Sequence, residues 1–222
     1  MIELKNITKR YKTATATVEA IKDISLHIKE GELVVLKGRS GSGKSTILSL
    51  IAALAKPTSG EVVVDGEHIS KLSDDFASAF RLQNIGFIFQ RYNLFVQMSV
   101  FENIITPLIP LGLPKEEVEA RVKKVSKEFS IEEKLEQKVR YLSGGEQQRV
   151  AISRALINHP KIILADEPTA NLDAKLSMEF IEHLKMLKDK KRTIVVATHD
   201  PLFFDLDFVD RIIELNGGIL CS

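Results

Sequence analysis

The sequence has little of several features that mark special classes of protein. Cysteine occurs once, as Cys221, so it has no partner for an intrachain disulfide and a reducing compartment is expected. Charge is nearly balanced, with 31 basic and 30 acidic side chains, which gives no reason to expect nucleic acid or an anionic membrane as a main partner. The longest apolar stretch, 104–113, is interrupted by Thr, Pro and Gly, and it falls short of the roughly 18–20 residues that a membrane span needs. The first five residues also lack the charged-then-apolar order of a signal peptide.

What is present is the composition of an ordinary soluble globular protein. The chain has 222 residues, of which 44% are hydrophobic and 27% charged. That length fits one large domain, or one domain with a modest insertion. The composition excludes disorder, collagen and a disulfide scaffold.

Short apolar runs alternate with helical stretches along most of the chain. Strands are expected at 33–36, 61–64, 85–89, 162–165 and 193–197, and helices at 44–55, 144–158 and 174–188. Several of the runs are apolar on both faces, as in strands covered by helices on both sides. The alternation therefore predicts an α/β core with a mainly parallel sheet. Residues 2–7 and 18–28 alternate differently and predict an antiparallel β edge.

A charged block follows the middle of the chain. Between residues 115 and 140, apolar side chains fall at spacings of four, three and four, at Val118, Val122, Val125 and Phe129. This pattern predicts an amphipathic helix with a solvated, charged outer face. We interpret the chain as one domain, 1–222. Its core and β subdomain take 1–90 and 150–222, and an inserted helical subdomain takes 91–149.

A glycine-rich loop gives the strongest chemical signal. It matches the pattern G-x-x-x-x-G-K-[ST] and consists of Gly38, Arg39, Ser40, Gly41, Ser42, Gly43, Lys44 and Ser45, followed by Thr46. The loop lies between a predicted strand and a predicted helix, where its amide groups and the helix N-terminus can bind phosphate oxygens. Lys44 can reach the β- and γ-phosphates, and the Ser45 hydroxyl can bind Mg²⁺. A chance Gly/Ser-rich turn is the alternative.

A second apolar strand ends in two acids, Asp166 and Glu167. Alone, such a pair is more often a helix or turn cap. In a chain with a phosphate loop, the aspartate is expected to serve the Mg²⁺ coordination sphere and the glutamate to act on the attacking water.

Ser143 and Glu146 form a third pattern, S-x-x-E, with Gly144 and Gly145 between them. This spacing predicts a capping box at the start of a helix. A glycine-rich helix N-terminus exposes amide donors, so it predicts a second anion-binding site. Two such sites in one chain suggest that a γ-phosphate is held from two sides.

Together these motifs resemble the nucleotide-binding subunit of ABC (ATP-binding cassette) transporters over essentially the whole chain. Residues 142–146 look like the family signature motif, and they follow the phosphate loop at a suitable distance (143 − 44 = 99). The resemblance implies a P-loop NTPase (RecA-like) core, hydrolysis of ATP, and ATP and Mg²⁺ as cofactors.

The resemblance also assigns residues whose own signals are weak. Tyr11 matches an aromatic that stacks on adenine, and Gln90 matches a glutamine that senses Mg²⁺ and the attacking water. Asp173, after Asn171 and Leu172, matches the D-loop, although Asn171 departs from the small residues of many members. His199 matches the switch histidine at the γ-phosphate. Without the family context, each would be taken as an ordinary structural residue.

In this family two cassettes pair head to tail, so that the phosphate loop of one and the signature motif of the other close over one ATP. The resemblance thus implies a homodimer in which Ser143, Gly144, Gly145 and Glu146 serve the partner's nucleotide. Glu167 would be the general base, and His199 and Lys44 would stabilise the transferred phosphoryl group. Gln90 would take part by sensing Mg²⁺ and the attacking water.

The family further implies integral membrane permease subunits as partners and a place on the cytoplasmic face of the inner (plasma) membrane. Residues 165–173, 94–101 and 70–75 are similar to the branch for lipoprotein release and macrolide export. A division-associated cassette or a soluble ABC ATPase without a permease are alternatives. A P-loop kinase of small metabolites would not explain the signature motif.

The apolar segment 92–101 is where a permease is expected to dock, although all of it could equally be core. We predict that Leu94, Phe95, Val96 or Met98 is exposed in the isolated subunit.

Overall fold

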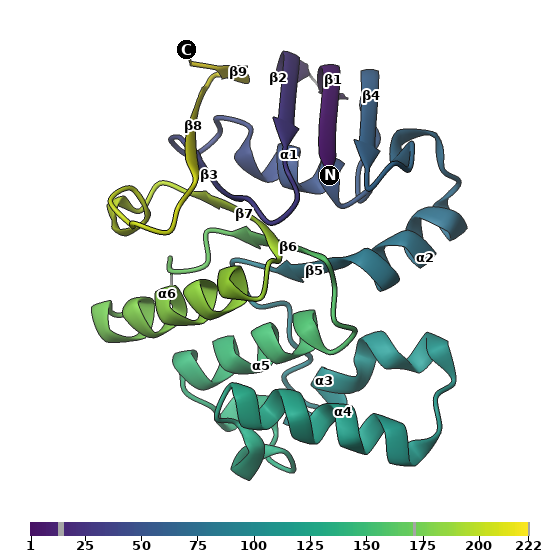
Figure 1. Ribbon diagram of the computed structural model, residues 1–222, viewed down its shortest axis with the longest axis vertical. Helices are drawn as coiled ribbons and strands as arrows, with labels where there is room; N and C mark the ends of the chain where they lie inside the picture. Colours follow the sequence, from purple (N-terminus) through teal and green to yellow (C-terminus); the bar gives the residue numbers. More distant parts are fainter. Residues whose placement is uncertain (13–15, 171, 222) are drawn as a thin grey trace.

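The architecture is layered, with a central sheet, a smaller sheet above it and helices between and below them (Figure 1). The structure is a computed structural model and describes residues 1–12, 16–170 and 172–221. The strands are β1 (Ile2–Lys12), β2 (Thr17–Ile28), β3 (Leu33–Lys37), β4 (Ser59–Val64), β5 (Ile85–Ile88), β6 (Ile162–Asp166), β7 (Thr193–Thr198), β8 (Arg211–Asn216) and β9 (Ile219–Leu220). The α-helices are α1 (Lys44–Ile51), α2 (Asp74–Asn84), α3 (Val100–Ile105), α4 (Lys115–Glu128), α5 (Gly144–Leu156) and α6 (Ala174–Asp189). The short 3₁₀ helices are η1 (Ile69–Lys71), η2 (Thr106–Leu111), η3 (Glu132–Lys134), η4 (Val139–Tyr141) and η5 (Pro201–Phe203).

The central sheet has the strand order β5-β6-β7-β3-β8-β9. Its first five strands pair in parallel, and β9 pairs antiparallel with β8. The register sets Lys37 beside Thr198, and Asp166 beside Ala197, so β3, β6 and β7 end at one edge of the sheet. The predicted α/β fold with a mainly parallel sheet is confirmed.

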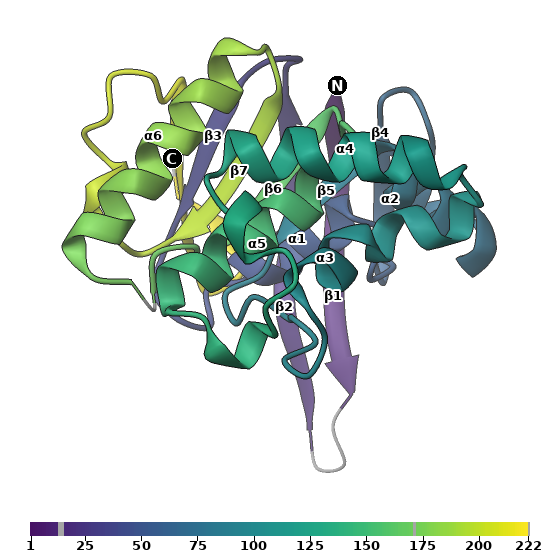
Figure 2. The same cartoon turned by 90° about the horizontal axis from the view of Figure 1, so that it is seen from below.

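Helices cover both faces of this sheet, as the apolar runs predicted. In β3, Leu33 and Val35 join a core that includes α3 to α6, whereas Val34 and Leu36 join a second core with α1 and the small sheet. All four side chains are almost completely buried. Figure 2 shows α3 to α6 gathered over the lower face. Strands buried on both sides form near-continuous apolar runs for this reason.

The run at 61–64 was wrongly grouped with the parallel strands. As part of β4 it pairs antiparallel with β1, with Ile2 opposite Val64, in a small sheet of order β2-β1-β4. The predicted antiparallel edge of 2–7 and 18–28 is confirmed as β1 and β2 of the same sheet. A short apolar run carries no information about which sheet it joins, because pairing depends on distant residues.

The helical subdomain packs its apolar side inward. Helix α4 ends near Phe129, well before residue 140, and the next residue, Ser130, has φ of 49° in the left-handed region. Val122, Val125 and Phe129 are buried, as their spacing predicted. The proposed division between residues 149 and 150 lies within α5. Helices α2 and α3 and strands β8 and β9 are elements that the sequence did not suggest.

Within the described residues, none of the helices combines the length and apolar character that crossing a membrane requires.

Replacing Phe129 with Ala tests the packing of the helical subdomain. The ring is fully buried and meets His183 of α6 edge-on, with the ring centroids 4.9 Å apart. We expect a loss of about 3–5 kcal/mol in the free energy of unfolding, measured by urea denaturation followed by circular dichroism. The control is Phe76→Ala on α2, where the side chain is 69% exposed and the change should stay within about 0.5 kcal/mol. Equal losses in the two variants would contradict the assignment of Phe129 to the core.

Candidate active site

The phosphate loop joins β3 to α1 at the edge where the parallel strands end. Gly43 has φ of 104°, and a Cβ there would lie 2.7 Å from the carbonyl oxygen of Ala20. At Gly38, a Cβ would lie 2.5 Å from the carbonyl oxygen of Leu215. Backbone approaches this close leave no room for a side chain at either position. The two glycines are therefore required by the packing of the loop against β2 and β8.

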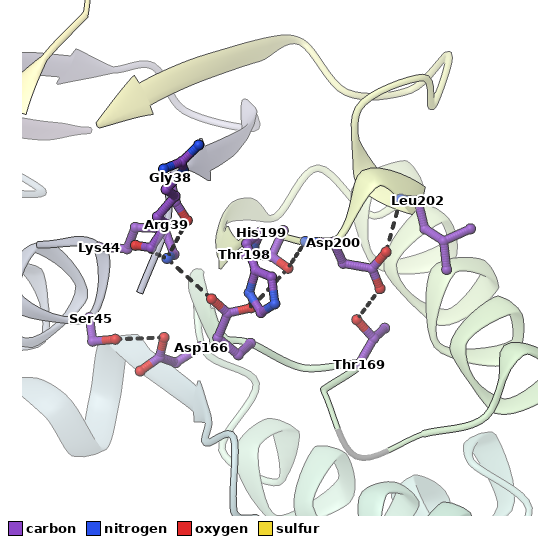
Figure 3. Close-up of polar contacts among 11 residues, drawn as sticks. Gly38, Arg39, Lys44, Ser45, Asp166, Thr169, Thr198, His199, Asp200 and Leu202 are labelled. Carbon is purple, nitrogen blue, oxygen red and sulfur yellow. Dashed lines mark hydrogen bonds and ion pairs between the residues drawn. The ribbon is translucent and has the colours of Figure 1, made fainter. Parts of the chain in front are cut away.

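The side chain of Lys44 lies over this loop and is only 5% exposed. Its Nζ donates to the carbonyl oxygens of Gly38, at 2.7 Å, and Arg39, at 3.2 Å (Figure 3). The same nitrogen lies 3.2 Å from Glu167 Oε1. An ammonium group has three N–H donors, and here each has an oxygen partner.

Ser45 and Asp166 meet at the bottom of the site. The Ser45 hydroxyl donates to Asp166 Oδ1 at 2.9 Å. Burial raises the pKa of the Asp166 carboxyl above its ordinary value, and the neighbouring charge of Glu167 adds to the effect, against the hydrogen bond from Ser45. A hydroxyl and a carboxylate are the hard oxygen donors that Mg²⁺ prefers, and a cation would offset the cost of the buried charge. These two residues therefore fit a magnesium site.

Glu167 follows β6 and holds the centre of the site. Its Oε2 accepts hydrogen bonds from Thr198 Oγ1, at 3.1 Å, and from the amide of His199, at 3.3 Å. His199 Nδ1 lies 3.0 Å from the same oxygen. Burial disfavours the charged carboxylate, but hydrogen bonds from His199 and Lys44 outweigh burial and lower the pKa of Glu167. Because an ionised carboxylate only accepts hydrogen bonds, Nδ1 is the donor in its contact with His199.

These groups border an open cleft of about 620 Å³. Of the residues selected from the sequence, the cleft is lined by Tyr11, Ser40, Gly41, Ser42, Gly43, Lys44, Ser45, Thr46, Gln90, Glu167 and His199. Gly38, Arg39 and Asp166 adjoin it through the hydrogen bonds to Lys44 and Ser45. Tyr11 is 40% exposed, and Lys9 Nζ lies 4.8 Å from the centroid of its ring.

The cleft also has walls that sequence reasoning missed. They come from β2 and from the turn between β8 and β9, with Val18, Glu19, Ala20, Lys22 and Gly217. None of these residues belongs to a motif. The register of β1 and β2, which sets Val18 opposite Tyr11, is the structural signal that identifies this wall.

The predicted second anion site lies elsewhere. Ser143 and Glu146 form the expected capping box at the start of α5, with the Glu146 amide donating to Ser143 Oγ at 3.3 Å and the Ser143 amide donating to Glu146 Oε2 at 2.8 Å. That second hydrogen bond lowers the pKa of Glu146. Ser143 and Gly144 are exposed, and residues 143–146 are not among those that line the cleft. In Figure 1, α5 lies below the central sheet, whereas α1, which follows the phosphate loop, lies above it.

Asp173 is likewise outside the cleft lining. Its side chain caps α6 by accepting a hydrogen bond from the Leu176 amide at 2.9 Å. Asn171, noted in the same motif, lies outside the described residues.

The apolar segment after Gln90 is partly exposed. Phe95 is 55% exposed and Val96 is 47% exposed, whereas Leu94 and Met98 are half-buried. The prediction of exposed apolar side chains in this segment is confirmed.

Comparison with known proteins agrees with this geometry. The sequence profile of the ABC transporter family matches residues 21–170. The ABC transporter ATP-binding protein MJ0796 of Methanocaldococcus jannaschii is 45% identical over 223 residues, covering 98% of this chain and 94% of that protein. The macrolide export ATP-binding/permease protein MacB of Salmonella paratyphi A is 38% identical over 218 residues, covering 98% of this chain but only 33% of MacB.

The fold is also similar to a solved structure. The MJ0796 cassette, in a dimeric post-hydrolysis state bound to ADP and Pi, superposes with a TM-score of 0.91 at 43% identity, covering 100% of this chain and 97% of that one. Sequence profile, relatives and fold agree with the phosphate loop, the partly buried acids Asp166 and Glu167 and the capped helix at the signature motif. The chain therefore belongs to the ABC transporter family, as an ATP-binding cassette with ATPase activity.

Proposed function

We propose that two copies of this chain close over two ATP molecules, hydrolyse them and thereby drive a membrane permease of the macrolide-export or lipoprotein-release type. The observation that carries the proposal is the position of Glu167. Its carboxylate lies between Lys44 Nζ, at 3.2 Å, and His199 Nδ1, at 3.0 Å, on the lining of the nucleotide cleft.

Lys44 and the loop amides bind the phosphates in this proposal. The loop carbonyls and Glu167 hold the Lys44 ammonium group in a fixed position. There it can pair with the negative charge of a phosphate. Thr46 and the loop serines Ser40, Ser42 and Ser45 line the same cleft. Tyr11, at the far end of β1, offers an exposed ring face on which adenine can stack.

Glu167 acts as the general base. The carboxylate, whose pKa lies below the ordinary value for glutamate, is ionised at neutral pH and can therefore accept a proton from the attacking water. His199, as a donor through Nδ1, orients that carboxylate, and with Lys44 it stabilises the transferred phosphoryl group. Gln90 lines the cleft from the end of β5 and positions the water.

Ser45 and Asp166, together with Gln90 from the cleft lining, would hold Mg²⁺. When bound, the ion supplies charge neutralisation for the phosphate oxygens. The 2.9 Å contact between Ser45 Oγ and Asp166 Oδ1 keeps both oxygens on one side of the cleft.

The separation of the signature motif from the cleft supports a dimer. Ser143 and Gly144 are exposed, and residues 143–146 and Asp173 lie apart from the cleft of their own chain. In a head-to-tail pair, the N-terminus of α5 in one copy would face the nucleotide held by the other. The dimeric arrangement of the MJ0796 cassette, which has the same fold, supports this assembly.

The exposed side chains Phe95 and Val96, five and six residues after Gln90, are the proposed contact with the permease. Through that contact the cassette would work at the cytoplasmic face of the membrane. The likeness to MacB, which combines a cassette and a permease in one protein, supports the export branch.

Glu167→Gln tests the general base. The amide cannot take up the water's proton, so we expect kcat for ATP hydrolysis to fall by a factor of about 10² or more. ATP should still bind, and an ATP-bound dimer should accumulate, measured by size-exclusion chromatography. Glu182→Gln, at an exposed position on α6, is the matched control and should hydrolyse ATP normally. Near wild-type turnover in Glu167→Gln would remove Glu167 from this role.

Lys44→Ala tests phosphate binding. The loss of a buried cation that points at the phosphates should weaken ATP binding by a factor of about 10 to 100, measured by titration with a fluorescent ATP analogue. Lys123→Ala, on the exposed face of α4, should leave the affinity unchanged. An unaltered affinity in Lys44→Ala would contradict the proposed role.

Phe95→Asp tests the permease contact. An apolar side chain that a partner covers cannot be replaced by a charge without loss of binding, so less of the variant should co-sediment with native membranes that contain the permease. The ATPase activity of the free cassette should remain. Ile219→Asp, at a 53% exposed position on β9, is the control. Equal membrane association of both variants would point to another docking surface.

A further inference from the structure

The segments that follow Glu167 and His199 are joined by a hydrogen bond that the proposed chemistry does not use. Thr169 Oγ1 donates to Asp200 Oδ2 at 2.6 Å (Figure 3). Thr169 lies two residues after Glu167 and is 5% exposed, and Asp200 directly follows His199. Neither Thr169 nor Asp200 is among the residues that line the cleft.

Three polar atoms of Asp200, the two carboxylate oxygens and the backbone amide, make hydrogen bonds. Its Oδ1 accepts a hydrogen bond from the Leu202 amide at 3.0 Å, which caps η5, while Oδ2 accepts from Thr169. Its own amide donates to Thr198 Oγ1 at 3.0 Å. That hydroxyl in turn donates to Glu167 Oε2 at 3.1 Å. These hydrogen bonds and the backbone of residues 167–169 thus form a closed ring, which runs from Glu167 through Thr169, Asp200 and Thr198 and back to Glu167.

The other side of this ring is fixed to the signature helix. The buried Gln148, on α5, donates through Nε2 to the carbonyl oxygen of Pro168 at 2.8 Å. Because Pro168 precedes Thr169 directly, the Thr169 hydroxyl projects from an anchored segment. The Thr169 hydroxyl therefore has a fixed position, and its hydrogen bond to Asp200 can hold the backbone around His199 in place.

The position of His199 depends more than that of its neighbours on the hydrogen bond between Thr169 and Asp200. Its side chain is 65% exposed, so packing constrains the ring little. The ring position is then set by its hydrogen bond to Glu167 and by the backbone on either side. Thr198, before it, is completely buried in β7, whereas Asp200, after it, is held by Thr169 and the η5 cap.

We propose that Thr169 and Asp200 are positioning residues that keep His199 within hydrogen-bonding distance of Glu167. This inference rests on the proposed function, because it takes Glu167 and His199 as the groups that act on ATP. Thr169 and Asp200 do not line the cleft, so we assign them no direct contact with the nucleotide or the attacking water. They act through the backbone of residues 198–200.

The test compares Thr169→Val with Thr169→Ser in the full chain. Valine keeps the shape of threonine without the hydroxyl, whereas serine keeps the hydroxyl. We expect Thr169→Val to lower kcat roughly tenfold, the effect of one hydrogen bond to a charged group. Affinity for a non-hydrolysable ATP analogue should stay within about twofold, because the phosphate loop is untouched. Thr169→Ser, which keeps the hydroxyl, should retain most of the wild-type kcat.

A double-mutant cycle with Asp200→Ala separates positioning from general damage. If Thr169 acts only through Asp200, then Thr169→Val should change kcat little once Asp200 has been removed. A tenfold loss in both backgrounds would overturn the proposal. So would wild-type turnover in Thr169→Val, or a loss of nucleotide affinity in step with kcat.

His199→Ala, measured in parallel, distinguishes this proposal from the one on which it rests. If His199→Ala abolishes hydrolysis while Thr169→Val turns over ATP at the wild-type rate, only the positioning role fails. If His199→Ala hydrolyses ATP normally, the assignment of His199 to the chemistry fails, and the positioning role fails with it.

Discussion

The parallel pairing of β3, β7, β6 and β5 is the constraint on which the site depends. Because these strands run in the same direction and in register, their carboxyl ends meet at one edge, where ligands of α/β proteins bind. Asp166 lies beside Ala197 in this ladder, which brings Glu167 next to His199. A slip of one residue would turn each side chain to the opposite face and separate the groups.

The site is also a balance of buried charges. Lys44 is almost completely buried, and burial of an unpaired ammonium would be costly. Glu167 offsets that cost, and hydrogen bonds from His199 and Lys44 keep the glutamate ionised. Among the described residues, no cationic group forms an ion pair with Asp166, and burial raises the pKa of its carboxyl. The arrangement therefore suits a polyanion at the lysine and a cation at the aspartate, which is the charge pattern of a magnesium nucleotide.

The two glycine-rich helix starts have similar local chemistry but different surroundings. The helix start at α1 lies in the cleft. The helix start at α5 is exposed, and in its capping box Ser143 and Glu146 hydrogen-bond each other. Gln148 joins α5 to the segment after Glu167, and Thr169 joins that segment to Asp200, which directly follows His199. Helix α5 is thus joined by a buried hydrogen bond to Pro168, the residue that directly follows the proposed base.

Local patterns in the sequence were sufficient to predict the phosphate loop, the capping box at Ser143 and the strands that are buried on both faces. Each of these features depends on residues close together in the chain. Local patterns could not assign 61–64 to its sheet or identify Val18 as a wall of the cleft, because strand partners are chosen by distant residues. The bond between Thr169 and Asp200, 31 residues apart, left no pattern either. The sequence by itself determined which chemical groups this protein has. Only the tertiary structure decided which of them meet, since hydrogen bonds and strand register form between segments whose approach no local periodicity encodes.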